Sequence, residues 1–139
     1  MCALDIHTEE RKNTFKKYER LSKRKDIKEL FDKGSSFFLY PFSVKYVFLP
    51  SNEAPQLLIA IPKKKLKKSP HRNLMKRRVR EVYRSNKHVF VENLHNREVS
   101  VHFAVIYAAS ELLDYNFIEN KLSLVIDRLL KQDEIFKGE

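Results

Sequence analysis

The whole excess of positive charge in this sequence lies in one segment of 22 residues, 63–84. The chain has 139 residues, with 28 lysines and arginines against 18 acids. Eleven of these basic residues and a single acid, Glu81, fall inside the segment, so the rest of the chain carries 17 residues of each sign. A milder basic concentration over residues 11–33 is partly balanced by acids. The segment is therefore an electrostatic footprint on one part of the fold, not a general aid to solubility.

The footprint contains a predicted helix with two different faces. Ser69 and Pro70 form an N-cap and first-turn pair, which starts the helix near His71 and carries it to about Ser85. Four apolar side chains share one arc of this helix: Met75, Val79, Val82 and Tyr83. At 100° per residue, six cationic or amide side chains fall within about 140° on the adjoining arc. These six are Arg72, Asn73, Lys76, Arg77, Arg80 and Arg84. The helix can thus lie on a sheet with its basic face outward.

This basic face predicts a polyanionic partner. A merely solvated helix mixes signs to gain pairs at i,i+4 spacing, each worth about 0.2–0.5 kcal/mol, whereas this face accepts repulsion of similar size. Arginines suit bidentate contacts with phosphate, and the Asn73 amide can donate and accept. A lysine run over residues 63–68 extends the positive surface. The net charge of +10 alone would also fit an anionic membrane surface, but its localisation favours nucleic acid.

The other elements predict one α+β domain. A helix over residues 23–33 starts after Ser22 and stops at Gly34. Alternating residues indicate strands over 37–49 and 98–107, and the apolar run 57–61 reads as a buried central strand. A last amphipathic helix follows Asp114 and extends to about residue 130. We expect a polar tail over residues 1–20, a single domain over 21–131 and a short C-terminal tail over 132–139.

The sequence predicts no chemistry of its own. Cys2 is the sole cysteine, which excludes an internal disulfide and a thiolate zinc site. The five histidines are not spaced as metal ligands or beside a nucleophile, and no carboxylate pair recurs as a metal clamp, so we expect neither catalytic residues nor a metal site. The first twenty residues contain no apolar run suited to a signal peptide, which favours a cytoplasmic protein without membrane association.

Two motifs resemble the bacterial ribonuclease P protein family. The footprint reads IPKKKLKKSPHRNLMKRRVREVYR, which is similar to that family's paired-lysine strand end, its Arg-Asn-Arg motif and its basic helix. The upstream RLSKRKDIKELFDKG resembles the family's first helix, so the likeness spans about residues 20–130. Three positions depart from the family pattern. Leu74 replaces the second arginine and lies off the cationic face, lysines replace a loop glycine, and Ile27 replaces an aromatic residue.

The resemblance implies a fold and two RNA surfaces. The implied fold is a small, mainly antiparallel sheet of about four strands with three helices, like the second domain of a small-subunit ribosomal protein, with a left-handed βαβ crossover. Arg72, Asn73, Lys76, Arg77, Arg80 and Arg84 would dock on the catalytic RNA. A cleft would hold the 5′ leader of precursor tRNA through Ile27, Phe31, Lys63 and Lys64, together with Lys45 or Tyr46, of which one can face it. An aromatic residue on an amphipathic helix is more often a core residue than a platform for bases, and Phe31 can be both.

The resemblance also implies a role as an accessory subunit. The holoenzyme would be an endoribonuclease that matures the 5′ end of tRNA, with one protein per RNA, and the RNA would carry the chemistry and bind Mg²⁺. Two alternatives remain open on the sequence alone: a ribosomal or other structured-RNA binding protein, and a DNA-binding module that places the basic helix in a major groove.

Overall fold

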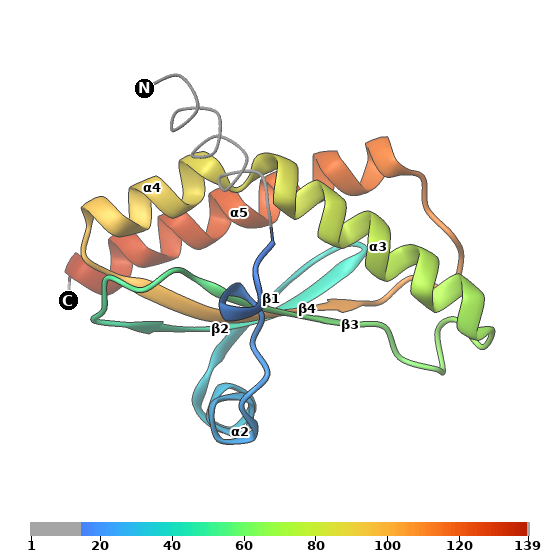
Figure 1. Ribbon diagram of the computed structural model, residues 1–139, viewed down its shortest axis with the longest axis horizontal. Helices are drawn as coiled ribbons and strands as arrows, with labels where there is room; N and C mark the ends of the chain where they lie inside the picture. Colours follow the sequence, from blue (N-terminus) through green and yellow to red (C-terminus); the bar gives the residue numbers. More distant parts are fainter. Residues whose placement is uncertain (1–14, 139) are drawn as a thin grey trace.

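The computed structural model describes residues 15–138, and the side chains of residues 15–132. A four-stranded sheet has three helices on one face and one helix on the other (Figure 1). In chain order the elements are η1 (Lys17–Glu19), α2 (Arg24–Lys33), β1 (Ser35–Leu39), β2 (Phe42–Leu49), β3 (Gln56–Ala60), α3 (Ser69–Asn86), α4 (His88–Asn96), β4 (Ser100–Tyr107) and α5 (Tyr115–Gly138). The predicted α+β class is confirmed.

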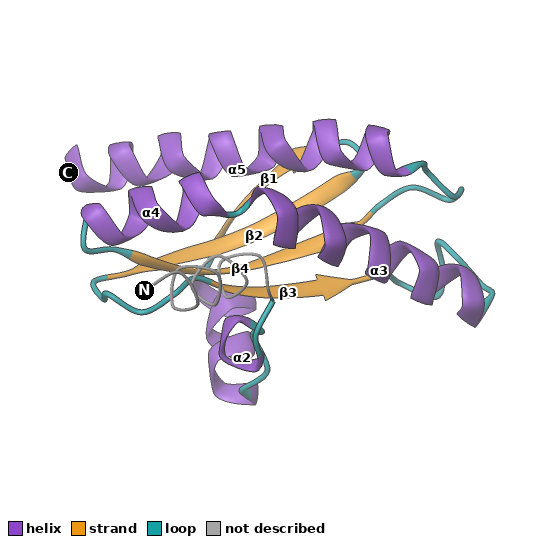
Figure 2. Cartoon of the chain, turned by 45° about the horizontal axis from the view of Figure 1, so that its top comes forward, coloured by secondary structure: helices purple, strands orange, loops and turns teal. Residues whose placement is uncertain are grey.

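The sheet is mainly antiparallel, with strand order β1-β2-β4-β3. β2 pairs antiparallel with both β1 and β4, while β3 pairs parallel with β4. Parallel neighbours need a crossover connection, and α3 and α4 supply it across one face of the sheet (Figure 2). This is the βαβ unit that the resemblance implied. Helix α3 therefore starts from the end of an edge strand and crosses the sheet.

The main core lies between the sheet and α3, α4 and α5. Strands β2 and β4 contribute alternate residues such as Val44, Phe103 and Val105, all fully buried. The apolar arc of α3 meets them, as its spacing predicted: Met75, Val79, Val82 and Tyr83 are all buried. Each such side chain contributes about 1.5–3 kcal/mol when it leaves water. This packing fixes the rotation of α3 about its axis and so determines which residues face outward.

A smaller core lies on the opposite face, beneath α2. Leu30 of α2 is fully buried there, and Leu21 and Ala104 join it in one cluster. α2 covers only part of this face: Phe38 on β1 remains 58% exposed. Ser22 does not cap α2 as predicted: Lys23 occupies the N-cap position, without a side-chain hydrogen bond. Gly34 does end the helix, as expected.

The strand expected over residues 37–49 is two strands, and the one expected over residues 57–61 is not central. β1 and β2 form a hairpin around Tyr40 and Pro41, with Leu39 paired to Phe42. The apolar alternation continues through the turn, so Pro41 was the one available signal. β3 is an edge strand. Its apolar run is continuous because both faces are covered, with Leu57 in the main core and Leu58 beside α2.

The sequence predicted three helices, and the described part of the chain has a fourth α-helix, α4. Phe90 and Leu94, four residues apart, are its buried residues, and this i,i+4 pair was the signal that was missed. α3 begins at Ser69 with Pro70 in its first turn, but Lys68, not Ser69, is its N-cap. The start of α5 after Asp114 is as predicted, since the Asp114 carboxylate accepts from the Phe117 backbone N–H at 2.9 Å.

Both predicted tails include residues that form regular structure. Residues 15–20 belong to the folded domain: the Leu21 backbone N–H donates to the Leu57 carbonyl at 3.0 Å, and Arg20 bridges to Leu57 along the outer edge of β3. At the other end, α5 continues to Gly138. Residues 1–14 of the expected N-terminal tail lie outside the described residues. No described helix is long and apolar enough to cross a bilayer.

Candidate nucleic-acid interface

The outward face of α3 carries the cationic residues that the sequence placed there. Asn73 and Arg77 are exposed, and Lys76, Arg80 and Arg84 are partly buried. Because the opposite side of the helix is locked into the core, these groups are displayed on a rigid rod and not on a mobile chain. The residues on this outward face are together called the α3 face.

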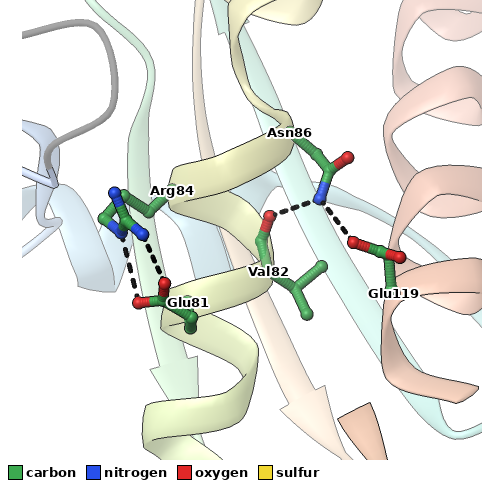
Figure 3. Close-up of polar contacts among 5 residues, drawn as sticks. All are labelled: Glu81, Val82, Arg84, Asn86 and Glu119. Carbon is green, nitrogen blue, oxygen red and sulfur yellow. Dashed lines mark hydrogen bonds and ion pairs between the residues drawn. The ribbon is translucent and has the colours of Figure 1, made fainter. Parts of the chain in front are cut away.

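Arg84 and Glu81 form an ion pair on the α3 face (Figure 3). The Arg84 Nε donates to Glu81 Oε2 at 3.1 Å, and its Nη2 donates to Oε1. This hydrogen bond lowers the pKa of Glu81 and raises the pKa of Arg84. The side chains of Arg84 and Glu81 are 35% and 50% exposed, and exposed pairs of this kind are worth at most about 1 kcal/mol. The pair orients the Arg84 guanidinium but is weak enough for this group to bind a phosphate instead.

Arg72 holds the lysine run in place. Its Nη1 donates to the backbone oxygens of Leu66 at 2.9 Å and Lys67 at 2.8 Å. Leu66 is itself buried, and its backbone N–H donates to Pro62. The run is thereby a defined turn, with exposed ammonium groups on Lys63, Lys64, Lys65, Lys67 and Lys68. Its charges lie beside the first turn of α3 and extend the α3 face.

Two cationic residues have positions that the sequence did not reveal. Arg78 points toward the other side of α3 and donates to the Leu113 backbone oxygen, so it joins α3 to the segment before α5. Arg20 comes from the N-terminal segment, where its guanidinium lies 5.3 Å from the centroid of the Phe15 ring. Both line a groove along α3 with Arg77, Arg80 and Arg84. Arg20 had no helical or strand period that could have placed it there.

Three of the predicted leader-cleft residues meet on the face of the sheet that α2 shares. The Lys45 ammonium lies 5.3 Å from the centroid of the Phe31 ring, which is 39% exposed. Ile27 is partly buried and packs against the small core, so it lies beneath this surface. Lys63 and Lys64 are exposed just after the end of β3. A ring beside cations is a suitable platform for unpaired bases.

Tyr46 does not lie on this face of the sheet. It lies on the opposite face of the sheet, 9% exposed, with its hydroxyl hydrogen-bonded to the Gln132 side chain at 3.2 Å. Neighbouring strand residues point to opposite faces, so Lys45 and Tyr46 could not both have lined it. Phe38 was missed: it pairs with Ser43 across the hairpin and so shares the face of Lys45. The sequence could have revealed this pairing only if the hairpin turn at Tyr40 and Pro41 had been recognised.

Metal-binding chemistry is not evident in residues 15–138. No group of three or more histidine, cysteine, aspartate or glutamate side chains in this range is arranged to hold an ion. The ionic groups of the interface are mainly donors, which suits binding of phosphate oxygens.

The comparisons with known proteins point the same way. The family model described as Ribonuclease P matches residues 15–130. The Ribonuclease P protein component of Porphyromonas gingivalis (strain ATCC 33277) is 32% identical over 115 residues, covering 81% of this chain and 84% of that protein. The component of Petrotoga mobilis is 31% identical over 121 residues, covering 84% and 95%.

Solved structures agree with the fold. The RNase P protein from Thermotoga maritima has a TM-score of 0.62 at 28% identity, covering 79% of this chain and 96% of that one. The Staphylococcus aureus RNase P protein, at 23% identity with a TM-score of 0.59, covers 82% of this chain and 96% of its own, and supports the fold alone.

Proposed function

Since the chain belongs to the ribonuclease P protein family, we propose that its α3 face docks on the catalytic RNA of that enzyme while the α2 side of the sheet holds the 5′ leader of precursor tRNA. The chain is the protein component of ribonuclease P, an endoribonuclease in which the protein is the accessory subunit. Its partner is RNA. The proposal assigns each of its two surfaces to one RNA.

One observation carries the assignment of the α3 face: its cations share one side of a helix whose other side is locked in the core. Each phosphate that such a face neutralises releases condensed counterions, which supplies a large share of the affinity for nucleic acid. Arg77 and Arg80 have no carboxylate partner in the described structure, so no acidic side chain there neutralises their charge. The lysine run adds charge beside the first turn of α3.

The leader would lie across the open part of the sheet beside α2. Phe31 and Phe38 offer exposed rings, and Lys45, Lys63 and Lys64 offer ammonium groups for the backbone. Stacking on such rings tolerates any base, at about 1–3 kcal/mol per base, which suits leaders of different sequence. We assign Ile27 to the support of this surface and leave Tyr46 out of it.

In this proposal the protein has no catalytic residue. The catalytic RNA would bind the Mg²⁺ ions, and the protein would raise substrate affinity and screen the repulsion between the two RNAs' phosphates. One protein per RNA, acting in the cytoplasm, completes the proposal. The ribosomal and DNA-binding alternatives have no feature here that favours them over the family assignment.

The test is reconstitution with the cognate catalytic RNA. Cleavage of precursor tRNA is measured with and without the protein over a series of magnesium concentrations. The proposal predicts that the protein alone cleaves nothing and that it lowers the magnesium concentration needed by the RNA. An unchanged rate at every magnesium concentration would refute it.

A further inference from the structure

A groove of about 590 Å³ runs along α3 between the N-terminal segment and the start of α5. Phe15 and Arg20 form one wall, Tyr115 belongs to the other, and the side chains of Arg77, Arg80 and Arg84 line it from α3. Its volume falls within the range of about 300–1,000 Å³ that holds single small ligands and is too small for a folded partner. This cavity is named the α3 groove.

The charge of the α3 groove calls for an anion. Five arginines line it, Arg20, Arg77, Arg78, Arg80 and Arg84, against one carboxylate, Glu81. Arg80 adds a sharper signal, because its Nε is buried and has no hydrogen-bond partner among the described residues. An unsatisfied buried donor costs about 1–3 kcal/mol, and an acceptor brought from outside would recover this free energy.

The groove also carries rings, which a pure phosphate site would not need. Phe15 packs edge-on against Tyr83, with the ring centroids 5.6 Å apart and the planes at 84°. The Arg20 guanidinium lies 5.3 Å from the Phe15 centroid. Tyr115, the first residue of α5, also lines the groove. Aromatic rings and guanidinium planes are the surfaces on which unpaired bases stack.

The wall that carries Phe15 and Arg20 is fixed by a buried ion pair. Glu19 of η1 is 4% exposed and accepts from Lys87, which is 5% exposed, at the junction of α3 and α4. Breaking a buried pair by removing one partner costs several kcal/mol, so the segment is firmly attached. The rings of the groove are therefore held in place before any ligand arrives.

We propose that the α3 groove binds a single unpaired nucleotide of the RNA partner. The phosphate meets Arg77, Arg80 and Arg84, and the base enters between Phe15 and Tyr115. The inference rests on the proposed function and narrows it. Part of the α3 face would bind one nucleotide that is not stacked within an RNA helix. A continuous duplex presents phosphates but no free base, so it leaves the rings of the groove unused.

The test uses the absence of tryptophan from this chain. Phe15→Trp places a single indole in the α3 groove, and its emission is followed during titration with a single-stranded RNA pentamer or with an RNA duplex of the same composition. We expect saturable quenching by the pentamer and none by the duplex. Arg80→Ala added to the reporter weakens the pentamer's half-saturation about tenfold or more, as expected for loss of a charge-assisted hydrogen bond.

Tyr40→Ala added to the reporter is the matched control, because it removes an exposed ring that belongs to neither RNA surface and should leave the quenching curve unchanged. Tyr115→Trp reports from the opposite wall if Phe15→Trp does not fold. Equal quenching by duplex and pentamer, no quenching at either position, or a curve unaffected by Arg80→Ala would overturn the inference. Magnesium-dependent cleavage by the reporter holoenzyme separates the two claims: normal stimulation with an unquenched indole leaves the proposed function intact and refutes the groove site.

Discussion

Arg72 donates a hydrogen bond of 2.9 Å from its Nη1 to the backbone oxygen of Leu66, six residues earlier in the chain. The same nitrogen reaches Lys67 at 2.8 Å. A helical wheel groups Arg72 with the RNA contacts of the α3 face, but the structure shows that part of its guanidinium is engaged inside the protein. Arg72 therefore positions the lysine run, whatever further contact its other N–H groups make with RNA.

Removing Arg72 should loosen the lysine run before any RNA is present. In Arg72→Ala we expect the Leu66 amide to exchange its hydrogen at least about fivefold faster, because two charge-assisted bonds that hold its turn are lost. Hydrogen exchange of the free protein measures this. Arg77→Ala is the control, since the Arg77 side chain is exposed on the α3 face. Equal rates in the two variants would show that Arg72 does not position the run.

The leader surface can be tested by two substitutions on opposite faces of the sheet. Phe31→Ala should lower holoenzyme affinity for precursor tRNA by about 1–3 kcal/mol relative to a leaderless tRNA, through lost stacking. Tyr46→Phe should leave this difference unchanged, because the Tyr46 hydroxyl bonds Gln132 on the far side. Binding is measured for both RNAs with each variant. A loss with Tyr46→Phe as large as that with Phe31→Ala would contradict the assignment.

The ion pair between Glu19 and Lys87 predicts a large and correctable loss of stability. Lys87→Met leaves a carboxylate buried without its ammonium partner, which should reduce the free energy of unfolding by about 3–5 kcal/mol. Adding Glu19→Leu removes the uncompensated charge and should restore much of the loss. Urea denaturation of the single and double variants gives these values. If adding Glu19→Leu does not reduce the loss of stability caused by Lys87→Met, the ion pair does not fix the N-terminal segment.

His102 should make stability fall in mild acid. Burial lowers the pKa of this imidazole below its usual 6.5, although Asp26, Glu53 and Glu29 act in the opposite direction and Lys23 reinforces burial. The unfolded chain therefore binds the proton first, so the contribution of His102 is complete above about pH 6.5 and is lost as pH falls below it. Unfolding free energies at about pH 7.5 and 5 should differ more in the native chain than in His102→Gln. Equal differences would contradict this.

The parts of the fold that follow from local period were predictable. The two arcs of α3 follow from its 3.6-residue repeat, because sterics and burial fix them within a few turns. The same holds for β4, whose alternate residues Val101, Phe103 and Val105 are all fully buried. α4 was overlooked because one i,i+4 pair in nine residues is a weak pattern.

The parts that depend on contacts between distant residues were not predictable. Alternation shows that Lys45 and Tyr46 face opposite ways, but not which of them faces α2, since helices lie on both sides of the sheet. β3 has the apolar run of a central strand because covering helices, and not flanking strands, bury it. The α3 groove joins Phe15, Arg80 and Tyr115, which are far apart in the sequence and share no pattern.

Phosphate contacts by the α3 face are the central claim, and the salt dependence of binding to the catalytic RNA measures them directly. Arg77→Ala and Arg80→Ala should each reduce the slope of log K against log salt by about one unit, and the double variant by about two. Lys131→Ala, an exposed cation on α5, should leave the slope unchanged. If the double variant kept the slope of the native protein, the α3 face would not be the surface that binds the RNA.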